Sequence, residues 1–127
     1  MALVFTKVRT EHGSSLVADV NSGVLCVNPR YDRQLTVVDG WVRSTGTADT
    51  CTSVDFGDGT TSAIAFNVAG LADATVLRAG AANTVVTNMG TALLKNKGIY
   101  LKTVGAGIGT ATAIEWCVKY LVSNTES

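Results

Sequence analysis

The chain has 127 residues, a length typical of one domain and sufficient to bury a hydrophobic core without disulfides or a metal. Ten basic and ten acidic residues cancel, so no excess of positive charge marks a surface for nucleic acid or anionic lipid. Charged residues make up only 16% of the chain, against about 25% in ordinary domains, which favours a surface used in permanent contacts with other chains.

The cysteines and the N-terminal sequence indicate a reducing compartment. Cys26, Cys51 and Cys117 are odd in number and lack C-x-x-C spacing, so neither a disulfide framework nor a zinc site is predicted. The apolar run Ala2–Phe5 is too short for a signal peptide, and no stretch approaches the ~20 apolar residues of a membrane helix. We therefore expect a protein made in the cytoplasm, with no membrane partner.

Strand signals begin near the N-terminus. Residues 2–8 and 23–27 are short strand candidates, and the second ends at the turn marker Asn28-Pro29. Between these strands, the sequence His-Gly-Ser-Ser at 12–15 is interpreted as a polar turn.

The longest strand in the first half is predicted over 34–46. Strict alternation places Leu35, Val37 and Trp41 on one face of this strand. Gly40 within it indicates a bulge or a close approach of another group to the backbone.

Three further elements are expected in the middle of the chain. Residues 52–56 and 60–68 surround Gly-Asp-Gly and predict a hairpin. Residues 69–80 offer the best place for one short helix or turn, and residues 92–96 for one more strand.

Two alternating segments, 98–104 and 112–122, flank the loop Gly-Ala-Gly-Ile-Gly at 105–109. The loop lacks the spacing of a dinucleotide fingerprint, because Thr110 occupies the third glycine position and no helix pattern follows. We interpret the loop as a hairpin connection, and we predict no cofactor.

No catalytic or metal-binding residues are predicted. His12 is the single histidine, and its spacing to Ser14, Ser15 and Asp19 gives no support for a nucleophilic triad. Asp55 and Asp58 offer oxygens beside a glycine turn, but the further acids of a calcium loop are missing, so the hairpin interpretation is preferred.

The aromatic residues allow two interpretations. A sugar-stacking platform would use both tryptophans and all three tyrosines: Trp41, Trp116, Tyr31, Tyr100 and Tyr120. Both tryptophans are in phase with aliphatic residues on their strands, which favours packing in the core or between subunits.

Together these elements predict an all-β fold. Eight or so short strands separated by Gly, Asn and Asp indicate a single domain over residues 1–127, an antiparallel β-sandwich that is jelly-roll-like and has at most one short helix.

An oligomer interface is expected on the outer side of this sandwich. Ala113, Cys117 and Leu121 lie opposite the Trp116 face of the last strand and need cover from another chain or a loop. Leu3 and Phe5, on a first strand with little protective charge, complete the predicted interface of a homo-oligomer.

The segment 90–122 resembles the C-terminal half of small β-sandwich virion proteins of tailed bacteriophages. Gly98–Thr103, Gly105–Thr110 and Trp116–Tyr120 carry the likeness, and residues 36–61 are similar to the first half of those proteins. The resemblance implies a capsid decoration (cement) protein at the virion surface, often a trimer, whose partner is the major capsid protein. Alternatives are a phage tail or head-fibre component, another carbohydrate-binding β-sandwich module and, least favoured, an enzyme.

Overall fold

The structure is a computed structural model that describes residues 7–48, 51–67 and 72–123. These residues form mostly strands, with one six-residue helix. In chain order the elements are β1 (Arg9–Leu16), α1 (Val17–Ser22), β2 (Val24–Val27), β3 (Leu35–Thr45), β4 (Cys51–Gly57), β5 (Ser62–Asn67), β6 (Val76–Arg78), β7 (Thr84–Val85), β8 (Ile99–Gly105) and β9 (Ala113–Val122).

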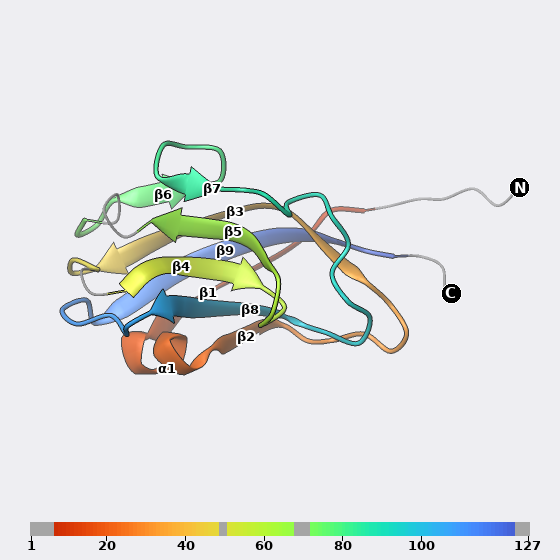
Figure 1. The fold of residues 1–127 in the computed structure, drawn as a ribbon, viewed down its shortest axis with the longest axis horizontal. Coiled ribbons are helices and arrows are strands. Elements are labelled where there is room, and N and C mark those ends of the chain that lie inside the picture. Colours follow the sequence, from red (N-terminus) through yellow and green to blue (C-terminus); the bar gives the residue numbers. More distant parts are fainter. Residues whose placement is uncertain (1–6, 49–50, 68–71, 124–127) are drawn as a thin grey trace, which may run out of the picture.

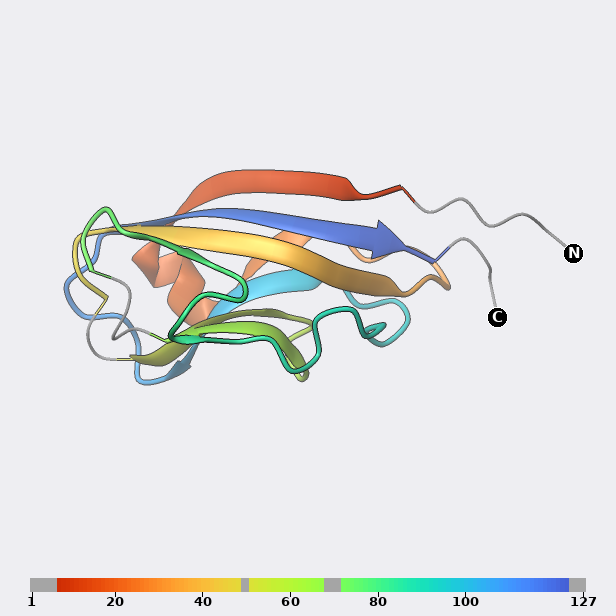
Figure 2. The same ribbon diagram turned by 90° about the horizontal axis from the view of Figure 1, so that it is seen from above.

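The strands form two antiparallel sheets that pack face to face (Figures 1 and 2). Sheet A has the order β1-β9-β3-β6, and sheet B has the order β2-β8-β4-β5-β7. The pairs are nested: β4 with β5, β3 with β6, β2 with β8 and β1 with β9. This nesting is the connectivity of a jelly roll, and it confirms the predicted all-β sandwich.

The centre of the core lies where Trp116 of β9 meets sheet B. Its ring packs edge-on against Phe56 with centroids 6.5 Å apart, and Phe56 packs against Phe66 at 5.9 Å. On the other side a Cβ at Gly13 would lie only 2.9 Å from the Trp116 ring. The indole N–H donates to Ser15 Oγ at 3.1 Å, so the ring is buried with its polar atom satisfied. The predicted burial of Trp116 is confirmed.

Strand β3 contains the irregularity that its glycine predicted. The register with β9 shifts between Val37 and Asp39, and the buried positions change from Val37 to Gly40 and Val42. A Cβ at Gly40 would lie 3.1 Å from the Phe56 ring, so the predicted close approach is also confirmed. Because the shift exchanges the faces, the prediction that Trp41 shares a face with Val37 is wrong, and Trp41 lies half-buried on the outer side.

The loop at 105–109 is not a hairpin. Strand β8 pairs only with β2 and β4 of sheet B, whereas β9 belongs to sheet A, so the loop crosses between the two sheets. Ile108 is buried at this end of the sandwich, and its backbone N–H donates to Asn21 Oδ1 of α1 at 3.0 Å. The hairpin interpretation failed because alternation identifies strands but not the sheet to which each belongs.

Three other elements predicted from the sequence differ from the structure. Within 69–80 the described residues contain β6 and no helix, while the helix of the fold is α1. Residues 92–96 form only one isolated bridge, between Thr36 and Ala92. The first strand begins at Arg9, so residues 12–15 lie inside β1 and not in a turn; residues 2–6 lie outside the described part of the chain.

The Gly-Asp-Gly hairpin between β4 and β5 is confirmed. Asp58 is buried there, and its Oδ1 accepts hydrogen bonds from the backbone N–H groups of Thr60 (2.8 Å) and Thr61 (2.6 Å). The Asp58 carboxylate therefore stabilises the turn in which it lies.

Replacing Trp116 by alanine removes the ring that joins the two sheets. We expect a loss of about 3–5 kcal/mol in the free energy of unfolding, measured by urea denaturation. The matched variant Trp41→Ala, on the outer side of the same sheet, should lose less than half as much. Equal losses for the two variants would contradict the placement of Trp116 at the centre of the core.

Candidate interaction surface

The outer face of sheet A is defined by the register of its four strands. One row of side chains crosses the sheet as His12, Cys117, Trp41 and Arg78. The next row, two residues along each strand, is Ser14, Glu115, Arg43 and Val76. The face therefore has an aromatic residue and a thiol at its centre, with charged groups beside them.

Cys117 is a packing group on this face. It is only 7% exposed although its strand neighbours Glu115 and Lys119 are exposed. Burial raises the pKa of the Cys117 thiol, an effect that the nearby Lys119 partly offsets. A thiol with a raised pKa is protonated at neutral pH and behaves as a small apolar group.

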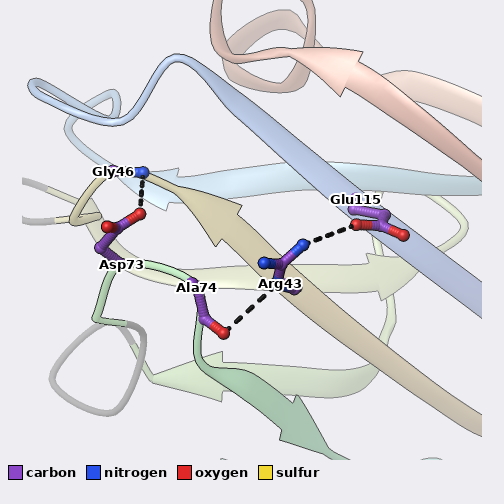
Figure 3. A network of polar contacts seen from close by, with 5 residues as sticks. All are labelled: Arg43, Gly46, Asp73, Ala74 and Glu115. Atoms are coloured by element: carbon purple, nitrogen blue, oxygen red, sulfur yellow. Dashed lines mark hydrogen bonds and ion pairs between the residues drawn. The ribbon is translucent and has the colours of Figure 1, made fainter.

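A polar network holds one end of the same face (Figure 3). The guanidinium of Arg43 lies 3.3 Å from Glu115 Oε2 and donates from Nε to the Ala74 carbonyl at 3.2 Å. The backbone N–H of Gly46 donates to Asp73 Oδ1 at 2.7 Å. Because the ion pair is about half exposed, it adds at most about 1 kcal/mol to the free energy of unfolding. The two hydrogen bonds to Asp73 and Ala74 hold the segment before β6 against β3.

The predicted interface residues are only partly brought together. Ala113, Cys117 and Leu121 all lie on the outer side of β9, where the first and last are half-buried and Cys117 is buried. Leu3 and Phe5 lie outside the described residues. The role of these five residues in an interface stays a prediction.

Strand β1 forms one edge of sheet A and offers a surface that the sequence did not reveal. The Val17 N–H donates to the Thr112 carbonyl at 3.1 Å, which continues the β1–β9 register. Hydrogen-bonded pairs alternate in an antiparallel ladder, so odd residues of β1 point their backbone groups toward β9. Thr10, His12, Ser14 and Leu16 therefore direct theirs toward the other side, where no strand pairs with β1 in the described ranges.

The residues weighed for chemistry are not gathered into a site. Ser14 lies on the outer face beside His12, but Ser15 points into the core toward Trp116, and Asp19 lies in α1. Asp55 is hydrogen-bonded to Ser53, whereas Asp58 is buried in its own turn. Within residues 7–48, 51–67 and 72–123 no cluster of three or more metal-ligating side chains occurs.

The aromatic residues do not form one platform. Trp116 and Tyr120 are buried in the core, and Trp41 lies on the outer face of sheet A. Tyr31 is 87% exposed in the connection between β2 and β3, and Tyr100 lies on the opposite sheet. The interpretation of the tryptophans as packing residues is correct for Trp116.

Comparison of the chain with protein-family models, curated proteins and solved structures found no match. Among the described residues no helix is long and apolar enough to cross a membrane.

The cysteines provide a direct test of the packing. Burial raises the pKa of the Cys26 thiol from 9.0 to about 12, against a smaller lowering by a backbone hydrogen bond from Leu101. The thiolate fraction at pH 8 is thereby reduced, so alkylation of Cys26 by iodoacetamide should be at least about a hundredfold slower in the folded protein than in urea. Mass spectrometry of tryptic peptides measures this rate. Equal rates in the two states would show that the partly buried Cys26 thiol is not shielded by the fold.

Proposed function

We propose that this chain is a structural virion protein, a capsid decoration (cement) protein of a tailed bacteriophage. In this proposal it forms a homo-oligomer, a trimer by the resemblance noted in the sequence, and binds the major capsid protein at the outer surface of the shell. It is made in the host cytoplasm and is not an enzyme.

The observation that carries the proposal is the outer edge of β1, with which no strand of the described residues pairs, here called the free edge. Soluble monomers protect such edges with charge, proline or a covering segment. Arg9 and Glu11 supply charge to the first half of β1, but residues 12–16 include no proline, lysine or carboxylate. Leu16 at the end of this edge is 64% exposed. Pairing with a strand of a second chain would satisfy the backbone groups and cover Leu16.

The face beside that edge supports the same proposal. Its central row contains the half-buried Trp41 next to Cys117, and Val76 is exposed near the opposite edge. Tryptophan is enriched where protein interfaces exclude water. The jelly-roll topology is also shared by many viral capsid domains, although lectin domains use it too, so the fold alone does not decide between the two.

Blocking the free edge of β1 should dissociate the oligomer. The substitution Ser14→Pro removes a backbone N–H group that points away from β9. The hydrogen bonds between β1 and β9 should therefore remain. We expect the parent protein and Ser14→Ala to be oligomers in multi-angle light scattering, and Ser14→Pro to be a folded monomer. An oligomer that persists in Ser14→Pro would exclude this edge as the contact.

Binding to the shell should depend on the outer face of sheet A. We expect the purified protein to co-sediment with undecorated phage capsids, and Trp41→Ala to bind at least about tenfold more weakly because a central interface aromatic is lost. Tyr31→Ala, which removes an exposed aromatic elsewhere, should bind normally. Failure of the parent protein to bind capsids, together with a strictly monomeric state, would defeat the proposal.

A further inference from the structure

The outer face of sheet B is hollowed along its middle strands. The register aligns Lys102, Asp55, Ala65 and Val85 in one row across β8, β4, β5 and β7. Short side chains on β4 and β5 form the floor of this hollow. Taller residues form the two walls: Tyr100, Lys102 and Val104 on β8, and Val85, Thr87 and Asn88 at and after β7.

Two adjoining cavities make up this groove. One, of about 110 Å³, lies on the β8 side, and the other, of about 460 Å³, lies on the β7 side. They share Asp55 and Ser62, so the two cavities adjoin at these residues. The larger volume falls within the range of about 300–1,000 Å³ that small-molecule sites typically have.

We propose that this groove binds a neutral saccharide chain, with Asp55 at its centre. A saccharide presents closely spaced hydroxyl groups that both donate and accept hydrogen bonds, together with flat faces of C–H groups. The groove offers hydrogen-bonding partners for the hydroxyl groups and apolar surface for the C–H faces. It lies on sheet B, whereas the free edge of β1 belongs to sheet A.

The floor provides oriented acceptors for hydroxyl groups. The Ser53 hydroxyl donates to Asp55 Oδ1 at 2.5 Å, which fixes the carboxylate while leaving Oδ2 to accept from a ligand. Asn88 donates from Nδ2 to the Ser62 carbonyl at 2.9 Å, so its Oδ1 is held in a set orientation at the other wall. A carboxylate and an amide carbonyl fixed in this way are acceptors that need no reorganisation when a sugar hydroxyl binds.

The walls provide apolar surface for the C–H faces of the sugar rings. Tyr100 is half-buried on β8 and lines the smaller cavity. Val104 and Val85 are 46% and 59% exposed on opposite walls, so each offers apolar surface to the groove. Aromatic and apolar faces of this kind pack well against C–H groups.

The charge of the groove argues against other ligand classes. Lys102 and Asp55 are direct neighbours across β8 and β4, so the two charges balance. Nucleic acid and polyphosphate need several cationic groups together. Among the described residues Lys102 is the only cationic one that lines these two cavities, and the one further lysine nearby, Lys97, lines the adjoining cavity beyond Tyr100. A peptide added as a strand would pair with β7 at this edge of the sheet, but β7 has only two residues.

The test is a calorimetric titration of the purified parent protein with neutral hexasaccharides: maltohexaose, cellohexaose, xylohexaose, mannohexaose and chitohexaose. Ala65→Trp fills the floor without removing a hydrogen-bonding group, and Tyr100→Ala removes one wall. Tyr31→Ala is the matched control for Tyr100→Ala because it alters an exposed tyrosine outside the groove, and Glu115→Gln is a second control that removes a carboxylate from the opposite sheet.

We expect at least one hexasaccharide to bind, and binding to weaken about tenfold or more in Ala65→Trp and in Tyr100→Ala. The two control variants should bind as the parent does. Far-UV circular dichroism of each variant shows whether it is folded, and the two groove variants alter different strands, so one remains informative if the other fails to fold. The assay uses no capsid, so its result is independent of the proposed shell binding.

Three results would overturn the proposal. The first is no binding of any of the five hexasaccharides at millimolar concentration. The second is binding that is unchanged in both groove variants, which would place the ligand elsewhere. The third is binding of heparin or polyphosphate in the groove in preference to every neutral probe, which would show that the ligand is anionic.

Discussion

The packing of Trp116 between the two sheets is the contact on which the rest of the fold depends. Strand β9 is paired on both sides, with β1 and with β3. Its inward residues are buried in the core along most of the length of the strand. The Trp116 ring has room on one side because Gly13 has no side chain, and on the other side it packs against Phe56 in a T-shaped arrangement. These contacts hold β1 in the sheet, although β1 itself buries little.

The same packing determines which residues are left for other molecules. Gly40 lets Phe56 approach β3 closely, and the register shift before it sends Trp41 to the outer face. On sheet B the inward positions take Phe56 and Phe66, while the outward positions of β4 and β5 keep short side chains. Within the described residues, one outer face of the sandwich thus has an aromatic centre and an edge strand that no other strand pairs, and the other outer face has a polar groove.

Much of this architecture follows from local pattern. Alternation identifies β8 and β9 and the inward side of β9, and Asp58-Gly59 correctly marks the turn between β4 and β5. The sheet to which a strand belongs depends on its pairing with distant segments, which local pattern does not show. The sequence therefore predicts a hairpin at 105–109, where the chain crosses between the sheets. Strand β1 was missed because its residues are mostly polar or glycine and its pairing depends on β9. The groove on sheet B depends on rows formed by four strands, which no single segment reveals.

The central claim, that the free edge of β1 pairs with another chain, is tested most directly by amide hydrogen exchange of the purified protein, resolved by NMR. The N–H groups of Gly13 and Ser15 point toward β9 and provide the internal reference. The account predicts that in the parent protein the N–H groups of His12 and Ser14 exchange as slowly as those of Gly13 and Ser15. In Ser14→Pro, the N–H group of His12 should exchange rapidly. Rapid exchange of His12 and Ser14 in the parent protein, with Gly13 and Ser15 protected, would contradict it.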